Sequence, residues 1–488
     1  MNIPTTIGSV DEDKKFDKKG VIRKMSHLER AFYQIPGLKV TMVVRLEGKV
    51  DPVSLQTAID RIPQKHPLLG AKVVFDADHT AWFSTEEVEK PMLSTMKRTS
   101  SAQWFSEFQK MQAEMFEPQR YPMADYRLLY DEKGADLIVM VSHVITDGTA
   151  MVFLLRDLLN LYADPQLKLE QVIPLPMSDY MALTRPSFTN WLTKRYASKY
   201  NKQWRCSPHS FDQPDYKAIN NAFWKKYTYG SVFLELKGQQ LNLLQQKCHN
   251  HEVSVGAAIA VAFLAAHEEQ QGAFTGNKRV ISIPFDLRRH ATRPVGDLFS
   301  LCVGTFMFPF RYKTKRSFWG NARELNKLVK KNMKRMNSAY MELEYFDATL
   351  LDAFNVFAYP VVKRWDLINH TENLKRFSQD TKNPAFKVVK SYEDKVPGTL
   401  FSNVGRVSIP NTYGDLKISR LALPSVINEN TNMLLVGATI SNHLVFTMAF
   451  AEEVDNREQP LTKQFINIRN RALELLGFPE TMSPDPFL

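Results

Sequence analysis

The sequence Val141-Ser142-His143-Val144-Ile145-Thr146-Asp147-Gly148 holds the most informative pattern of this 488-residue chain, a histidine followed after three residues by aspartate and glycine. The run 137–141 just before it is short, apolar and rich in β-branched residues, which predicts a buried strand. We therefore expect His143 at the end of a rigid element, with its imidazole facing a cleft. A neutral imidazole in such a place is the usual general base for taking a proton from a hydroxyl or amine.

The residues after the histidine indicate how its loop is held. Asp147 is placed to fix the loop, and Gly148 allows backbone or substrate to approach closely because it has no Cβ atom. The apolar residues of 151–161 predict a helix directly after the motif. A buried, hydrogen-bonded His143 with only a structural role is the alternative interpretation of this pattern.

The pattern His143-x-x-x-Asp147-Gly148 resembles the signature of the chloramphenicol acetyltransferase-like superfamily. That superfamily includes the condensation domains of nonribosomal peptide synthetases, alcohol acetyltransferases and polyketide-associated acyltransferases. The resemblance covers the chain from about residue 25 to its end. Condensation domains usually carry a second histidine just before the catalytic one, and here that position is Ser142. This departure weakens the peptide-condensation interpretation more than the acyl-transfer interpretation.

Two segments of the second half extend the resemblance. Ile283-Pro284-Phe285-Asp286-Leu287-Arg288 is similar to the segment whose arginine pairs with the motif aspartate, so the resemblance implies an Arg288–Asp147 pair. A guanidinium can bind a partly buried carboxylate bidentately, whereas the alternative is that Arg288 belongs to a merely basic loop. Ser402 and Asn403 occupy the place of a segment near the substrate channel, as possible channel or oxyanion residues or as part of a structural turn.

The resemblance implies a reaction and a set of roles. We expect acyl transfer from a coenzyme A or carrier-protein thioester to an alcohol or amine, with His143 as general base and Asp147 and Gly148 shaping the catalytic loop. Acyl-CoA or acyl-phosphopantetheine would be a co-substrate, with no permanently bound cofactor. The sequence offers His143 and Asp147 no convincing further metal ligands, so we expect no metal. The alternatives are a stand-alone condensation-type enzyme that acts on carrier-bound substrates, or a non-catalytic binding descendant of the fold.

Strands and helices alternate along both halves of the chain, which predicts an α/β (or α+β) protein. The predicted strands cover 40–46, 71–75, 137–141, 231–236, 279–287, 298–308, 406–409, 433–440 and 444–450. The predicted helices cover 26–33, 52–62, 151–161, 241–248, 255–267 and 466–476. With the resemblance, this order implies two chloramphenicol acetyltransferase-like lobes, each a mixed sheet with flanking helices. We expect an N-terminal lobe at 20–180, a proline-rich and basic linker at 181–225 and a C-terminal lobe at 226–488, after a loosely attached N-terminus.

Composition and charge narrow the setting and the partners. Cys206, Cys248 and Cys302 are odd in number and widely spaced, which favours a reducing compartment over a disulfide framework. The N-terminus lacks the apolar core of a signal peptide, and the longest apolar stretch, 255–266, is too short to span a bilayer. We therefore expect a cytoplasmic protein without a transmembrane segment.

The chain is basic, with a net charge of +11 and a pI near 9.2. This charge suits either a solvated surface or attraction to an anionic partner such as coenzyme A or an acidic carrier protein. The sequence lacks zinc-finger spacing, ribonucleoprotein motifs and a basic zipper, so nucleic acid is not an expected partner.

Overall fold

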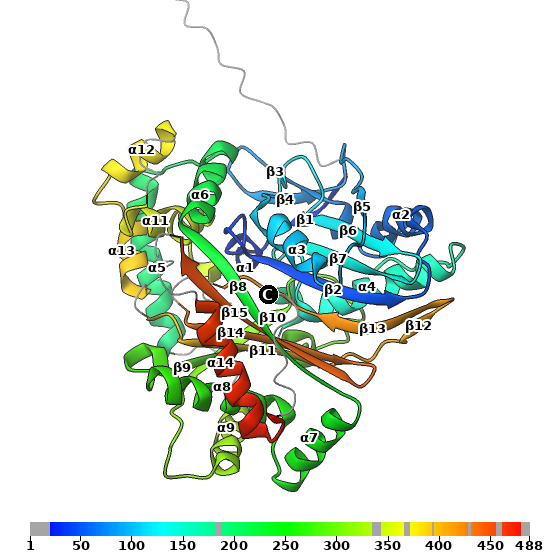
Figure 1. Cartoon of the computed structure of the whole chain (residues 1–488). Helices are drawn as coiled ribbons and strands as arrows, with labels where there is room; N and C mark the ends of the chain where they lie inside the picture. The colour runs from blue at the N-terminus through cyan, green and yellow to red at the C-terminus, as the bar shows by residue number, and fades with distance from the viewer. Residues whose placement is uncertain are drawn as a thin grey trace, which may run out of the picture.

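The computed structural model describes residues 20–181, 188–333, 343–365, 371–392, 395–427, 431–454 and 461–479. Two six-stranded sheets form the centre of the molecule, and helices pack around them (Figure 1). Both sheets contain parallel and antiparallel strand pairs. The predicted α/β class with two mixed sheets and flanking helices is therefore confirmed. The N-terminus that the sequence predicts to be loosely attached lies outside the described residues, which begin at residue 20.

The first sheet carries the His143 motif at the end of a central strand. Its strands, in spatial order, are β12 (Thr412–Tyr413), β13 (Leu416–Ala422), β2 (Lys39–Glu47), β7 (Gly134–Ser142), β6 (Ala124–Asp131) and β5 (Leu93–Lys97). All nine residues of β7 are buried, because α4 and α2 cover one face of this sheet and α3 packs on the other. The buried strand predicted over 137–141 is thus confirmed and extends further toward the N-terminus.

The second sheet belongs to the C-terminal half. Its strands, in spatial order, are β10 (Val303–Pro309), β9 (Val280–Asp286), β11 (Thr399–Arg406), β14 (Met433–Ile440), β15 (His443–Glu453) and β8 (Tyr227–Lys237). β14 and β15 confirm the strands predicted over 433–440 and 444–450, and they pair antiparallel as a hairpin. Helices α8 and α14 pack on each other and against this sheet, and α9 packs against α8 (Figure 1).

The C-terminal half of the chain contributes two strands to the first sheet. After β11 the chain leaves the second sheet, forms β12 and β13 at the edge of the first sheet, and returns as β14. β13 pairs with β2 along its length, so Val43 lies opposite Ala422. The first sheet therefore includes residues from the region 226–488, and the division of the chain into lobes at 181–225 stays a prediction.

The helices have the following bounds. In chain order the α-helices are α1 (His27–Arg30), α2 (Pro52–Arg61), α3 (Gln103–Ala113), α4 (Gly148–Ala163), α5 (Phe188–Cys206), α6 (Gln213–Lys226), α7 (Gln239–Asn250), α8 (Val255–Gln271), α9 (Phe318–Met333), α10 (Ala348–Asp352), α11 (Ala358–Val362), α12 (Glu372–Gln379), α13 (Pro384–Tyr392) and α14 (Leu461–Leu476). A π-helical turn, η7 (Ala353–Phe357), joins α10 to α11. A small sheet of β1 (Val21–Lys24), β4 (Ala81–Ser84) and β3 (Lys72–Phe75) lies beside the first sheet (Figure 1).

Local signals explain several helix starts. Ser26 caps α1 through a reciprocal pair of bonds with Glu29, Asp51 caps α2 with a proline at its first position, and Ser254 caps α8. The segment 181–225 contains two helices, α5 and α6, rather than an extended connection.

Two strand predictions were wrong. Residues 298–302, predicted as the start of a strand, precede β10 and bond to a buried arginine and a carboxylate instead of to a neighbouring strand. The strand predicted at 406–409 lies earlier, as β11, and ends at Arg406. Gly405 indicated a turn in the sequence, but it adopts φ +82° inside a bulge of the strand pairing.

Candidate active site

His143 directly follows β7, where Ser142 pairs with Lys39 of β2. Its backbone N–H donates to the carbonyl of Leu38, at 3.4 Å. The ring Nδ1 lies 2.8 Å from the carbonyl oxygen of Thr146, and only a donor can bond to a carbonyl. Nδ1 therefore carries the proton in the neutral ring, and Nε2 is left with a lone pair. This is the tautomer that a general base needs.

Burial lowers the pKa of His143 below its ordinary value of 6.5, although the Thr146 carbonyl and the charge of Asp147 oppose the shift. The ring of Phe32 packs edge-on against the imidazole, with 5.1 Å between ring centroids, and contributes to its desolvation. The imidazole is consequently neutral at pH 7, which leaves Nε2 free to accept a proton.

Asp147 fixes the loop rather than the imidazole. Its carboxylate caps α4 by accepting a hydrogen bond from the backbone of Ala150 at 2.9 Å, and it also accepts one from the backbone of Cys302 at 2.7 Å. Within the described residues it makes no hydrogen bond to the His143 side chain. Asp147 therefore determines where the loop and α4 begin.

Arg288 is the main partner of Asp147 and stands on a short helical turn after β9. Its Nη1 donates to both carboxylate oxygens of Asp147, at 3.1 and 2.9 Å, and to Asp286 at 3.1 Å. The rest of the guanidinium donates to the carbonyls of Leu298, at 2.8 and 3.0 Å, and Ser300, at 3.0 Å. The ion pair implied by the resemblance is present, and it is buried, with about 5% of each side chain exposed.

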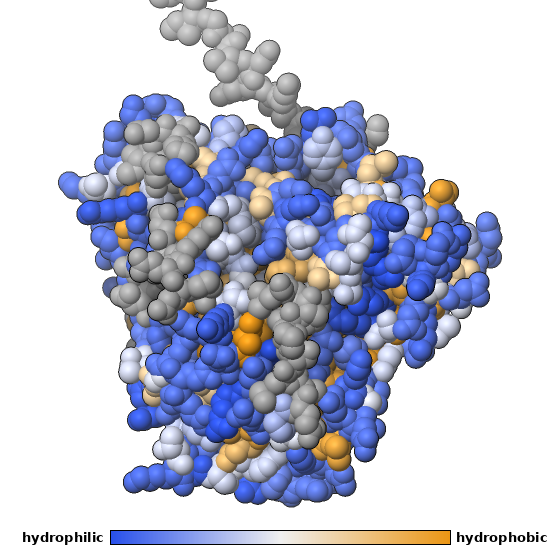
Figure 2. All heavy atoms as spheres, viewed as in Figure 1, coloured by the Kyte–Doolittle hydropathy of each residue, from blue (hydrophilic) through white to orange (hydrophobic). Residues whose placement is uncertain are grey.

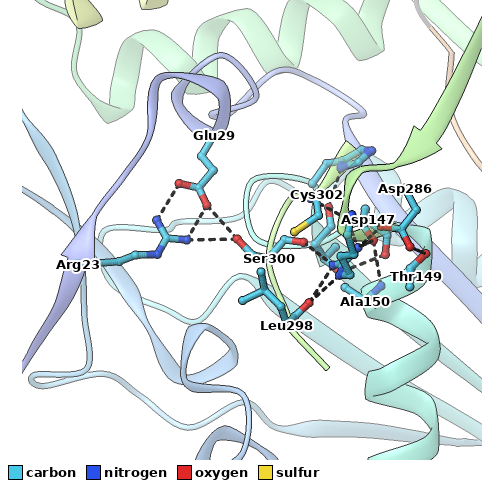
Figure 3. Close-up of polar contacts among 12 residues, drawn as sticks. Arg23, Glu29, Asp147, Thr149, Ala150, Asp286, Leu298, Ser300 and Cys302 are labelled. Atoms are coloured by element: carbon cyan, nitrogen blue, oxygen red, sulfur yellow. Dashed lines mark hydrogen bonds and ion pairs between the residues drawn. The ribbon is translucent and has the colours of Figure 1, made fainter. Parts of the chain in front are cut away.

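The segment 297–302, which leads into β10, joins this site to the N-terminal region. Figure 3 shows Arg23 and Glu29 pointing toward each other and toward Ser300, next to the residues around Asp147. Arg23 and Glu29 form a buried ion pair of 2.6 Å, and the Ser300 hydroxyl bonds to both at 3.3 and 3.2 Å. The loop that carries His143 and Asp147 is therefore tied, through this segment, to β1 and α1.

The same segment is held at its other end. Asp297 bonds to Arg156 of α4 at 2.5 Å, and Phe299 packs against the ring of His66. His66 is buried and bonds through Nε2 to Asp157 at 2.8 Å. Arg156 and His66 thus serve the packing of α4 against the segment.

No pattern in the sequence identifies Arg23, Glu29, Ser300 or Cys302 as residues of this site. These contacts join residues 155 to 277 positions apart, and no motif spacing marks them. Burial raises the pKa of the Cys302 thiol, so the thiol stays protonated and the residue serves the site through its backbone.

Gly148 and β11 meet at the start of α4. A Cβ atom added to Gly148 would lie 2.9 Å from a methyl carbon of Val404, so the close approach requires glycine. Ser402 is half-buried and lies two residues before Val404 on β11. Asn403 is exposed, and its side-chain oxygen accepts a bond from the backbone of Gly405 at 2.9 Å. Neither Ser402 nor Asn403 makes a hydrogen bond to His143 within the described part of the chain.

The described residues contain no group of three or more histidine, cysteine, aspartate or glutamate side chains that could hold a metal ion. No helix among them is long and apolar enough to cross a membrane.

Comparisons with known proteins relate the chain to acyl-transferring enzymes. No protein-family model matches it. It is 27% identical over 144 residues to phthiocerol/phthiodiolone dimycocerosyl transferase of Mycobacterium leprae, a match over 30% of this chain and 33% of that protein. The matched region therefore spans about a third of that curated relative.

Two solved structures are similar over nearly their full length. Trichothecene 15-O-acetyltransferase TRI3 from Fusarium sporotrichioides superposes with a TM-score of 0.59 at 10% identity, over 93% of this chain and 94% of that one. The first condensation domain of the CDA synthetase superposes with a TM-score of 0.58 at 11% identity, over 95% and 98%. The chain therefore has the same fold as these two solved proteins, an acetyltransferase and a condensation domain.

Proposed function

We propose that this chain is an acyltransferase, which moves an acyl group from a coenzyme A or carrier-protein thioester to an alcohol or amine. The observation that carries the proposal is the bond from Nδ1 of His143 to the carbonyl of Thr146. It leaves Nε2 as a proton acceptor on a neutral imidazole beside the glycine-started helix α4. The names of two similar proteins, a dimycocerosyl transferase and a 15-O-acetyltransferase, support the same class of reaction.

In the proposed mechanism, Nε2 of His143 takes the proton of the acceptor hydroxyl or amine as its oxygen or nitrogen attacks the thioester carbonyl carbon. The tetrahedral intermediate then expels the thiolate, which receives the proton from the imidazolium, so the ring returns to its neutral form. The thioester is already activated, and positioning and base catalysis lower the barrier. Asp147 and Arg288 take no part in proton transfer but hold the loop that carries the imidazole.

Other residues have proposed supporting roles. Ser402 shares its face of β11 with Val404, which lies against Gly148, so its hydroxyl is the better candidate for contacting the substrate or the oxyanion. Asn403 is better suited to a structural role, because its side-chain oxygen accepts a hydrogen bond from the backbone N–H of Gly405. If the donor is coenzyme A, Arg289 is an exposed cation next to the site for its phosphates.

The test is thiol release from acetyl, medium-chain and long-chain coenzyme A thioesters with a panel of alcohols and amines. We expect acceptor-dependent release that His143→Ala lowers about 10²- to 10⁴-fold in kcat/KM, with an unchanged circular dichroism spectrum. His249→Ala, on the exposed end of α7, is the matched control and retains full activity. Equal acceptor-dependent rates for wild type and His143→Ala would refute the role of His143.

If coenzyme A thioesters give no release, the same assay is repeated with an acylated carrier protein as donor. Transfer that depends on the carrier would support the condensation-type alternative. Absence of transfer from both donors would favour a binding function for this fold.

A further inference from the structure

An apolar cavity of about 300 Å³ lies between the α1–β2 connection and the helices α6 and α11. Its walls include Ile35 and Leu38 from the connection, Ile219 and Phe223 from α6, and Tyr359 from α11. These helices lie together beside α1 (Figure 1). The volume is at the lower end of the range for small-molecule sites in proteins, which is about 300–1,000 Å³.

The cavity is next to His143. The carbonyl of Leu38, which lines the cavity, accepts the backbone N–H of His143. A second, smaller pocket shares Ile35 and Leu38 with the cavity and is also lined by Phe32, whose ring packs against the imidazole. The α1–β2 connection therefore borders the cavity and contacts His143, through the Leu38 carbonyl on its backbone and the Phe32 ring on its imidazole.

The chemistry of the walls favours a hydrocarbon. Two polar side chains of the wall already have partners within the protein: Asn355 donates to the carbonyl of Ala31, at 3.5 Å, and the Tyr392 hydroxyl donates to the carbonyl of Phe354, at 3.1 Å. Trp365, also in the wall, has a buried indole N–H with no partner among the described residues, which suits a single acceptor atom of a ligand. A charged ligand group would lose its hydration on entering, whereas a methylene chain gains from burial.

The outer surface offers less to such a chain. The face seen in Figure 2 is largely hydrophilic, and hydrophobic residues show on it only in small groups. The exposed large hydrophobic side chains, such as Val53, Ile173 and Met307, come from separate elements of the fold. The apolar cavity, which is partly enclosed, is therefore the better place for the apolar part of a substrate.

We propose that this cavity holds the hydrocarbon chain of the acyl group, an inference that rests on the function proposed above. A methylene group is close in size to a water molecule, whose share of liquid volume is about 30 Å³, so the cavity takes roughly ten carbons. The acyl carbonyl lies at His143 and the chain passes Leu38 into the space beside Ile219. Medium-chain thioesters are the substrates that fit.

Binding is measured first, without catalysis. The probes are straight-chain acyl-N-acetylcysteamine thioesters of 2 to 16 carbons, which carry the end that coenzyme A and carrier proteins share, and the protein is the full chain with His143→Ala. Each added methylene should tighten binding about fourfold, since burial of a methylene is worth about 0.8 kcal/mol, until the cavity is full near ten carbons. Affinity that does not change with chain length would overturn the proposal.

Opposite changes at one position then test the location. Ile219→Phe fills the cavity and should move the optimum at least two carbons shorter, while Ile219→Ala enlarges it and should move the optimum longer. Loss of folding cannot produce shifts in opposite directions. Ile283→Phe, the same exchange at a half-buried position of β9 in the second sheet, is the control and keeps the wild-type optimum. An optimum that is the same in all four proteins would overturn the proposal.

The outcomes separate this inference from the proposed reaction. If binding depends on chain length and shifts with the Ile219 variants but no acyl transfer occurs with any donor, the cavity assignment stands and the reaction fails. If acyl transfer occurs but its chain-length profile ignores Ile219, the reaction stands and the cavity assignment is wrong.

Discussion

Replacement of Arg288 by methionine should destabilise the protein by about 3–5 kcal/mol, the cost of breaking a buried ion pair by removing one partner. The variant keeps an apolar stem of similar width but leaves the Asp147 carboxylate buried, with only the backbone donors of Ala150 and Cys302. It also removes the donors to the carbonyls of Leu298 and Ser300, which are buried residues. Both effects lower the free energy of unfolding.

The assay is urea denaturation followed by tryptophan fluorescence and by circular dichroism, with the free energy of unfolding taken from linear extrapolation where the two signals coincide. Arg289→Met is the matched control, because Arg289 is the exposed neighbour of Arg288, and it should change stability by less than about 0.5 kcal/mol. The double variant Arg288→Met, Asp147→Asn removes both charges. It should lose less than the sum of the single losses, with a coupling energy of about 1–3 kcal/mol.

The reasoning is refuted if Arg288→Met costs less than about 1 kcal/mol. It is also refuted if the two single losses simply add, because residues in one buried ion pair must be coupled. Either result would mean that the 297–302 segment and α4 are held mainly by packing, with the Arg288–Asp147 pair adding little.

Three further predictions concern acidity and space. Because burial lowers the pKa of His143 below its ordinary 6.5, the fall of kcat/KM on acidification should have its midpoint below pH 6.5, and a midpoint above pH 6.5 would contradict the assignment. Gly148→Ala should reduce kcat because the added methyl meets Val404, and the double variant with Val404→Ala should recover part of the activity; failure to recover would show that glycine is needed for another reason. Burial alone would raise the pKa of Glu235, but the hydrogen bond from His443 and the charge of Arg420 lower it to about 2, from an ordinary 4.5. Its stabilising effect is complete above pH 4.5 and is lost as pH falls toward 2, by up to about 3 kcal/mol, so stability measured across this window should fall less in Glu235→Gln than in wild type.

The sequence predicted the elements that local patterns define. The strand before His143, the helix after Gly148, the helix over 255–267 and the strands over 433–440 and 444–450 all follow from hydrophobic periodicity. The Arg288–Asp147 pair came from resemblance, because no local pattern predicts a contact between residues 141 positions apart.

What the sequence did not reveal depends on contacts between distant segments. The Arg23–Glu29–Ser300 contacts join β1 and α1 to the 297–302 segment, and each member alone is an ordinary polar residue. The alternation of apolar and polar residues over 416–419 is a strand signal that was missed. Even with that signal, no local rule identifies β2 as the partner of β13.

The pairing of β2 with β13 has a consequence for synthesis of the chain. β2 leaves the ribosome long before its partner at Leu416–Ala422, which follows more than 350 residues later. Until then one edge of β2 exposes unpaired backbone groups, which is a template for joining other chains. A pairing of such high contact order also forms slowly. We therefore expect this protein to depend on chaperones while it is made, and a fragment ending near residue 225 to aggregate rather than fold.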